Sequence, residues 1–206
     1  MLLANRLKSI HKTNQTFDPY WNNVSLLINT DPVDLSNNNH TFSGNLPDKD
    51  YYDGSNYISI TPHHSLQFED QDFTVEFTVN SPSYSGYMSL ITFASHYIDH
   101  RYFLYDVNNG KLRVVYSSTG HNRSENYYSL SSCFQPDIDN NIAICRHGSN
   151  QYIFCNGVKI IDTSFPYTSL FTSNSNMYYI GSYLGSSHFY TGYLKFIRIT
   201  KGVCRY

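Results

Sequence analysis

The chain has 206 residues, of which 20 are tyrosine and 13 are phenylalanine, and charged residues make up only 15% of it. A formal net charge of -2 argues against a nucleic-acid-binding protein, which needs a basic stripe to neutralise phosphates. No apolar run approaches the roughly 20 residues that span a bilayer, which argues against membrane insertion. Because tyrosine, phenylalanine, threonine and valine favour strands, the composition predicts an all-β protein.

Residues 1–16 differ from the rest of the chain, because apolar side chains recur there at helical spacing between basic ones. The pattern predicts a short amphipathic helix, which is marginal in isolation. It lacks the long apolar core of a secretory signal, so we expect synthesis in a host cytoplasm. We expect residues 1–16 to be an arm that attaches the protein to a partner through its apolar residues Leu2, Leu3, Leu7 and Ile10.

From Phe17 onward the pattern is one of short strands and turns. Phe73, Val75, Phe77 and Val79 alternate with polar residues, which is typical of a half-buried strand. An Asn-Gly turn joins the runs at 102–107 and 111–116 into a predicted hairpin. Further strands are predicted at 142–146, 151–155, 158–161, 178–180 and 193–200. About a dozen short strands predict a two-sheet antiparallel sandwich over residues 17–206.

The four cysteines, at positions 133, 145, 155 and 204, match no zinc-binding or redox spacing. Cys145 and Cys155 lie within apolar runs and resemble small buried hydrophobic residues. We expect all four to be free, reduced thiols, as is usual for a protein made in a reducing cytosol. The less favoured alternatives are a structural disulfide and a metal site.

Five segments carry a family pattern in their order and spacing. They are FDPYWNNVSLLINTD at 17–31, YYDGSNYISI at 51–60, DFTVEFTVN at 72–80, IAICRHGSNQYIFCNGV at 142–158 and YTGYLKFIRITKGVCRY at 190–206. Together they resemble the laminin-G-like jelly roll of the concanavalin-A-like lectin/glucanase superfamily. The resemblance implies a jelly-roll sandwich that works by binding.

Two positions depart from that family pattern. The family usually has tryptophan at the place of Thr78, and a Trp-His pair where this chain has Asn140 and Asn141. Strand pattern and turn glycines remain, so the departures indicate a diverged copy with the same fold. The opening DPYWNNVSLL and the ending ITKGVCRY resemble modules of bacteriophage head and tail proteins. By association, this indicates a virion protein.

Glycosidic bond cleavage in this superfamily uses paired carboxylates about 5 Å apart on one strand. The chain has three glutamates, Glu69, Glu76 and Glu125, and none has an acidic residue two positions away. Asp70 and Asp72 have that spacing but precede a strand, where acidic turn residues are ordinary. We therefore expect no enzymatic activity.

Calcium is the one cofactor that the resemblance implies, because many relatives carry it at the sandwich rim. Asp53 is the candidate ligand, although an Asp-Gly pair is also ordinary turn chemistry, and we favour the turn. Loop tyrosines are the better binding candidates, since a tyrosine ring presents an apolar face with a polar tip. The candidates for contact with a glycan or a partner are Tyr84, Tyr87, Tyr97 and Tyr183.

Two functions follow from these features. The first is a non-enzymatic structural protein on a virion surface, such as a decoration, head-fibre or tail-fibre subunit. Its partners would be other virion proteins through the arm and cell-surface glycans through the exposed domain. The second is a stand-alone carbohydrate-binding lectin module. The arm favours the first, and self-association into a homo-oligomer remains open under both.

Overall fold

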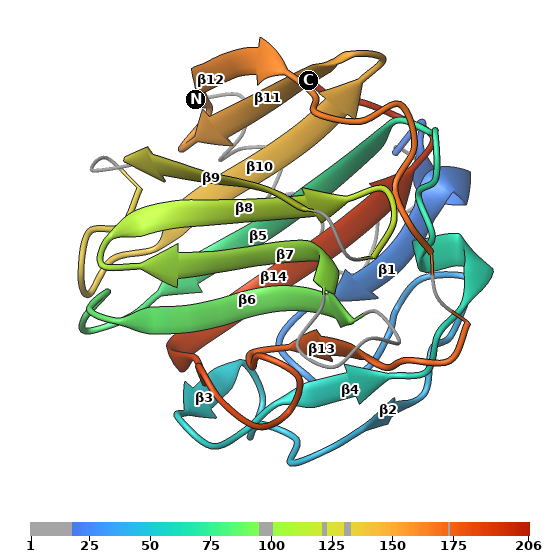
Figure 1. The fold of residues 1–206 in the computed structure, drawn as a ribbon. Helices are drawn as coiled ribbons and strands as arrows, with labels where there is room; N and C mark the ends of the chain where they lie inside the picture. The colour runs from blue at the N-terminus through green and yellow to red at the C-terminus, as the bar shows by residue number, and fades with distance from the viewer. Residues whose placement is uncertain (1–17, 95–100, 121–122, 130–132, 173) are drawn as a thin grey trace.

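The computed structural model describes residues 18–94, 101–120, 123–129, 133–172 and 174–206, which form two layers of antiparallel strands (Figure 1). The all-β sandwich prediction is confirmed. The predicted arm, with Leu2, Leu3, Leu7 and Ile10, lies outside the described residues, and so does Tyr97. Among the described residues, no helix has the length and apolar character needed to cross a membrane.

The first sheet is the rear layer in Figure 1 and has the strand order β1-β14-β5-β10-β11-β12, with β3 also paired to β14. The predicted β10–β11 hairpin is confirmed, and its register runs from Ile142 opposite Cys155 to His147 opposite Asn150. The strands are β1 (Val24–Ile28), β3 (Tyr51–Asp53), β5 (Phe73–Asn80), β10 (Asn140–His147), β11 (Asn150–Cys155), β12 (Val158–Ser164) and β14 (Thr191–Lys201).

The second sheet is the front layer and has the order β2-β4-β13-β6-β7-β8-β9 (Figure 1). Asn109 and Gly110 join β7 to β8 with φ angles of 48° and 72°. Because this tight hairpin turn requires positive φ at both residues, the Asn-Gly prediction is confirmed. The strands are β2 (Phe42–Ser43), β4 (Ile58–Ile60), β6 (Tyr87–Ala94), β7 (Arg101–Asn108), β8 (Lys111–Ser117), β9 (Arg123–Ser129) and β13 (Tyr178–Ile180).

Aromatic and branched side chains from both sheets fill the space between the layers. The predicted alternation of β5 places Phe73, Val75, Phe77 and Val79 in this core, fully buried. The prediction of a half-buried strand is wrong, because the C-terminal segment contacts Thr74 and Glu76 and buries the other face as well. The ring of Phe73 lies 5.6 Å from that of Phe103 on the opposite sheet. Burying each such side chain contributes roughly 1.5–3 kcal/mol to the free energy of folding, so the core holds the two sheets together.

The two ends of the described chain are held together on the outer face of the first sheet. β1 pairs with β14, and Arg205 Nη2 lies 2.9 Å from Asp18 Oδ2. On the same face Arg198 is buried and donates two hydrogen bonds to Glu76, at 2.5 and 2.6 Å. Tyr206 donates its hydroxyl to the same carboxylate. The opening and ending segments that resemble phage modules therefore form one packed unit.

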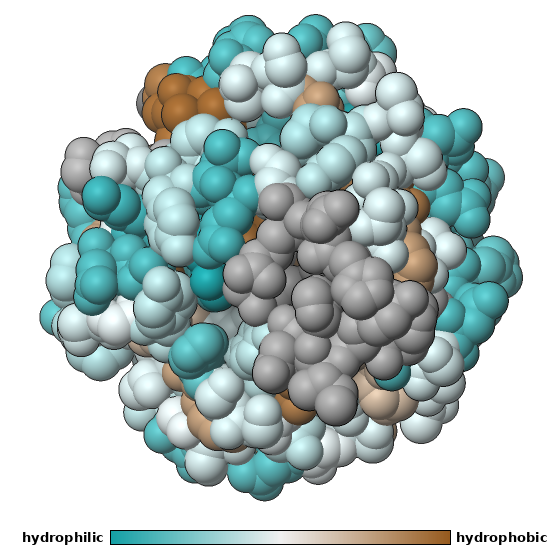
Figure 2. All heavy atoms as spheres, in the orientation of Figure 1, coloured by the Kyte–Doolittle hydropathy of each residue, from teal (hydrophilic) through white to brown (hydrophobic). Residues whose placement is uncertain are grey.

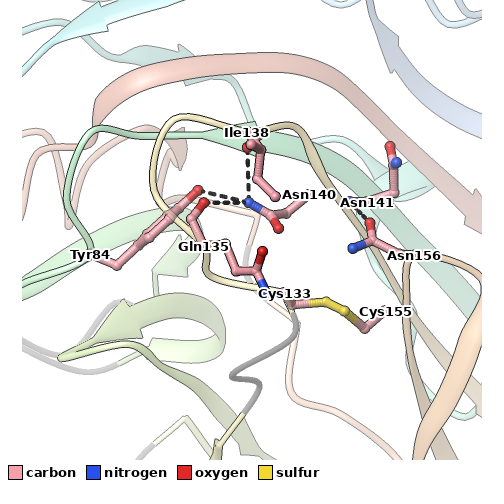
Figure 3. The surroundings of a disulfide bond; sticks show 8 residues. All are labelled: Tyr84, Cys133, Gln135, Ile138, Asn140, Asn141, Cys155 and Asn156. Atoms are coloured by element: carbon pink, nitrogen blue, oxygen red, sulfur yellow. Dashed lines mark hydrogen bonds between the residues drawn. A yellow bond between two sulfur atoms is a disulfide. The ribbon is translucent and has the colours of Figure 1, made fainter.

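The expectation of four free thiols is wrong, because Cys133 and Cys155 form a disulfide (Figure 3). Cys133 belongs to the connection between β9 and β10, which folds back over the inner face of β11, and both residues are buried. Their Cα atoms are 5.7 Å apart, although the residues are 22 positions apart in sequence. Cys145 and Cys204 are free.

Asn140 stands in the position where relatives carry tryptophan, and it fixes this connection (Figure 3). Its side-chain nitrogen donates to the main-chain oxygens of Gln135 and Ile138 at 3.0 and 2.9 Å. Asn141 bonds Thr78 on the neighbouring strand at 2.8 Å. Both departures from the family pattern are therefore accommodated by side-chain hydrogen bonds, from the buried Asn140 and the half-buried Asn141.

Candidate functional site

Tyr87 begins β6 at one end of the front sheet, and its ring is 39% exposed. The ring stacks on the imidazole of His188 with the centroids 5.0 Å apart. The guanidinium carbon of Arg113 lies 4.7 Å from the same ring centroid. A tyrosine ring in contact with these two planar groups presents its remaining surface in a fixed orientation.

Arg113 on β8 is buried and is anchored by two carboxylates. Its Nε donates to Asp106 Oδ1 at 2.8 Å, and its Nη1 donates to Glu125 Oε1 at 3.1 Å. Burial alone would lower the pKa of Arg113, but the hydrogen bond and charge of Asp106 raise it above its ordinary value. The guanidinium is therefore permanently charged and rigidly placed behind the exposed residues.

Tyr127 on β9 completes this surface, with a ring that is 45% exposed. Its hydroxyl donates to Glu125 Oε1 at 2.7 Å and is also hydrogen-bonded to Tyr87. Partial burial, then these hydrogen bonds, raise the pKa of Tyr127 to about 12. The hydroxyl therefore stays protonated at physiological pH and keeps its hydrogen bond to Glu125.

We call Tyr87, Arg113, Glu125, Tyr127 and His188 the tyrosine cluster. β6 begins and β9 ends at the left edge of the front sheet in Figure 1, so rigid strands carry the two rings. The cluster offers two partly exposed tyrosine rings beside a carboxylate oxygen, hydroxyls and a buried cation, with the Tyr87 ring partly covered by His188 and Arg113. Ring faces can stack on the C–H face of a sugar, and the polar groups between them can exchange hydrogen bonds with its hydroxyls.

The structure brings together two of the predicted tyrosines. Tyr183 is buried and packs against His188, with ring centroids 5.3 Å apart, so it supports the residue on which Tyr87 stacks. Tyr84 is not part of the cluster. It is only 6% exposed, its ring packs on Phe134, and its hydroxyl accepts hydrogen bonds from Ser81 and Asn140. Tyr84 lies in a loop, as predicted, but its side chain is buried and is not available to a ligand.

Sequence reasoning missed Tyr127, because residues 123–129 were not recognised as a strand. The signal was available in Glu125 and Tyr127, which are two positions apart and therefore share one face of β9. It also missed a second exposed pair, Tyr51 and Tyr193, on the outer face of the first sheet. Their ring centroids are 5.1 Å apart, and Tyr193 is 43% exposed.

Asp53 does not fit a calcium site. Its Oδ1 accepts hydrogen bonds from the amide and hydroxyl of Ser55, both at 2.8 Å, and from the amide of Asn56. The hydrogen bonds from Ser55 lower the pKa of the carboxyl. In the part of the chain that the structure describes, no group of three acidic, histidine or cysteine side chains could hold a metal ion.

The three glutamates lie too far apart to act together on a glycosidic bond. Glu76 is buried on the outer face of the first sheet, Glu125 lies on the outer face of the second, and Glu69 sits in the turn before β5. Asp106 is near Glu125, but it is fully buried and bound by Arg113. The three glutamates therefore do not form the pair of neighbouring carboxylates that glycoside hydrolysis uses.

The face of the molecule that carries the second sheet is mainly hydrophilic or intermediate in hydropathy (Figure 2). Strongly hydrophobic residues occur there as separate patches outside the grey region, the largest at the upper left of the view. Outside the grey region, the visible surface therefore shows no large continuous apolar patch.

The fold is that of a lectin-like jelly roll. A laminin-G family model, described as the concanavalin A-like lectin/glucanases superfamily, matches residues 52–204. The chain therefore belongs to this family, as its five sequence segments predicted. No curated protein matches the chain by sequence.

Solved structures of similar fold are binding domains of toxins. The botulinum neurotoxin serotype G binding domain has 12% identity and a TM-score of 0.69, with 88% of this chain and 49% of that chain covered. The binding domain of Paraclostridial Mosquitocidal Protein 1 has 16% identity, a TM-score of 0.62, and coverage of 90% and 50%. The botulinum neurotoxin DC binding domain in complex with SialylT has 11% identity, a TM-score of 0.63, and coverage of 90% and 50%. The chain spans about half the length of these structures, and at such identities the likeness concerns the fold.

Proposed function

We propose that the protein is a non-enzymatic lectin-like module that binds glycans through the tyrosine cluster. The observation that carries this proposal is the pair of exposed rings of Tyr87 and Tyr127, hydrogen-bonded to each other and held by Glu125 and Arg113. Similar folds occur in toxin binding domains, one of them solved in complex with SialylT, which supports a glycan ligand. Because the carboxylate pair is missing, incubation with β-glucans should release no reducing ends.

Binding to a single sugar should be weak. Each stacked ring contributes roughly 1 kcal/mol, so useful affinity requires many copies of the module. Displayed multivalently on a glycan array, the wild type should bind a defined glycan class. Tyr127→Ala and Tyr87→Ala should each lower the affinity roughly 5- to 10-fold, which corresponds to about 1–1.4 kcal/mol.

Matched controls separate the cluster from general surface effects. Tyr193→Ala removes a ring of almost equal exposure on the opposite sheet and should leave glycan binding unchanged. Tyr127→Phe keeps the ring but removes the hydrogen bond to Glu125, so its loss should be smaller than that of Tyr127→Ala. Binding that survives Tyr127→Ala but disappears with Tyr193→Ala would move the site to the first sheet.

We further propose that the module is displayed on the surface of a virion. Support comes from the sequence resemblance of the opening and ending segments to phage modules. In the structure these segments form one packed unit, in which Asp18 pairs with Arg205 and Trp21 packs against the cluster of Val24, Leu27 and Phe196. The arm, residues 1–16, directly precedes this unit and would attach it to other virion proteins. Mass spectrometry of purified particles should find the full chain among their components.

Deleting residues 1–16 tests the attachment role. The shortened protein should fold with an unchanged melting temperature, because the core contacts lie within the described residues, but it should no longer join particles. Replacement of Leu2, Leu3, Leu7 and Ile10 by serine should have the same effect, since burial of such side chains contributes about 1.5–3 kcal/mol each. Normal incorporation of both variants would contradict the proposal.

A further inference from the structure

A pocket of about 410 Å³ lies on the outer face of the first sheet, between the C-terminal segment and the hairpins of β10, β11 and β12. Aromatic rings form much of its wall, and those of Phe154 and Tyr206 are 5.2 Å apart. The pocket contains the thiol of Cys204, which is half-buried. Its lining residues are His147, Tyr152, Phe154, Lys159, Cys204 and Tyr206.

Thr74 on β5 holds Cys204 beside Cys145. The Thr74 hydroxyl donates a hydrogen bond to the main-chain oxygen of Val203 at 2.8 Å and accepts one from the amide of Arg205 at 3.0 Å. It therefore binds the residue before and the residue after Cys204. The same hydroxyl lies 3.6 Å from Cys145 Sγ. The Cys204 thiol donates a hydrogen bond to the main-chain oxygen of Tyr206 at 3.2 Å, and the Cys145 thiol interacts with it.

The sheet separates this pair from the existing disulfide. Cys145 lies opposite Thr74 and Tyr152, on the outer face of the first sheet, whereas Cys155 points into the core towards Cys133. A thiol on one face cannot reach a sulfur on the other without unfolding the strand. Cys145 and Cys204 are therefore each other's natural partners.

We propose that Cys145 and Cys204 form a redox-active pair, in which a peroxide oxidises Cys204 through the pocket and Cys145 completes a second disulfide. The Cys204 thiolate attacks one peroxide oxygen, the O–O bond breaks, and hydroxide leaves as a sulfenic acid forms. The Cys145 sulfur then attacks the Cys204 sulfur, and the S–O bond breaks with loss of water. Overall two thiols lose two electrons, and one hydrogen peroxide becomes two waters.

The surroundings of the two thiols explain why Cys204 reacts with the peroxide first and Cys145 reacts second. Cys145 is fully buried, whereas Cys204 faces the pocket. A hydrogen bond from Cys145 to the Cys204 sulfur lowers the pKa of Cys204 to about 6, although burial opposes the shift. The same interaction, together with burial, raises the pKa of Cys145. Because Cys204 faces the pocket and its thiolate is the favoured one, Cys204 is assigned as the nucleophile.

The oxidation product is the first test. In the purified full chain, alkylation under denaturing conditions without reductant should label Cys145 and Cys204 only. After equimolar hydrogen peroxide both labels should be lost, and the tryptic peptide 202–205 should be disulfide-linked to the peptide that ends at Arg146. Peroxide treatment that leaves both thiols free to react would overturn the proposal.

Variants separate the two roles. Cys145→Ala should leave a sulfenic acid on Cys204 that dimedone traps, whereas the wild type should trap little because Cys145 resolves it. Cys204→Ser alters only a half-buried residue and should protect Cys145 from peroxide. Equal dimedone labelling of the wild type and Cys145→Ala, or oxidation of Cys145 in Cys204→Ser, would show that the sulfurs do not act as a pair.

The pH dependence of alkylation in the folded protein provides a readout that a structural role would not change. Reactivity follows the thiolate, so the rate at Cys204 should reach half its maximum near pH 6 rather than at about 8.5, as for an ordinary cysteine. In Cys145→Ala the midpoint should move upward, because the hydrogen bond to the thiolate is lost. An unchanged midpoint would refute the assigned interaction.

Discussion

At the scale of single residues, the outer face of the first sheet buries charges that must be paired. Arg198 donates two hydrogen bonds to Glu76. Asp18 pairs with both Arg198 and Arg205, and Tyr206 donates a hydrogen bond to Glu76. Removing one member of a buried pair leaves the other charge without adequate compensation. This network therefore fastens the C-terminal segment to the sheet.

Glu76→Gln should lower the free energy of unfolding by about 3–5 kcal/mol, because Arg198 loses the carboxylate that offsets its desolvation. Glu69→Gln is the matched control, since Glu69 is exposed and its replacement should change stability by less than about 0.5 kcal/mol. Urea denaturation of the two variants measures the difference. Equal stabilities would show that the network contributes nothing to holding the segment.

The ionisation of the Asp18 carboxyl should make the stability of the fold depend on pH. Burial alone would raise the pKa of Asp18, but the hydrogen bonds from Arg205 and Tyr20 and the charges of Arg205 and Arg198 lower it below its ordinary value. The ionised carboxylate therefore stabilises the fold above the unfolded pKa of about 3.9, and this contribution is lost as pH falls through the lower folded value. Melting temperatures measured between pH 7 and pH 2 should fall less steeply in Asp18→Asn than in the wild type. Parallel curves would contradict the assignment.

At the scale of elements, β14 passes β5 so closely that only glycine fits at position 192. A Cβ atom there would lie 2.3 Å from the main-chain oxygen of Asn80 and 2.8 Å from Ser81 Cα, and the residue has a φ of 123°. Main chain cannot move aside as a flexible side chain would. The β-bulge between Leu194 and Phe196 follows directly in the same strand.

Gly192→Ala should lower the free energy of unfolding by about 3 kcal/mol or more, from backbone strain and overpacking together. Gly110→Ala is the matched control, because Gly110 also has a positive φ, of 72°, but a Cβ atom added there would meet nothing within 4 Å. That variant should lose only about 1 kcal/mol. Thermal melts of both proteins check the prediction, and similar losses would mean that the close approach is relieved elsewhere.

Elements with a strong local pattern could be predicted from sequence. The alternation around Phe73 predicted β5, and the Asn109-Gly110 turn predicted the β7–β8 hairpin. The disulfide could not be predicted, because it depends on the connection around Cys133 folding back onto β11. The candidate site was found in part: Tyr87 is exposed as expected, but the burial of Tyr84 depends on Phe134 and Asn140, which are distant in sequence.

At the scale of the whole molecule, the Cys133–Cys155 disulfide limits the freedom of the unfolded chain. Closing a loop with a sequence separation of 22 should stabilise the fold by about 3 kcal/mol in the chain-entropy view. The double variant Cys133→Ala, Cys155→Ala should therefore have a free energy of unfolding lower by about that amount. Urea denaturation with and without reductant checks this, because reductant should destabilise the wild type and leave the double variant unchanged.

The pairing of β1 with β14 and of Asp18 with Arg205 has a consequence for how this module can be joined to other proteins. Its entrance and exit points are neighbours, so a host protein can accept it within a surface loop without separating the residues on either side. A gene encoding such a unit can spread as a cassette through unrelated proteins. Each recipient gains the exposed face of the second sheet and keeps its own core intact.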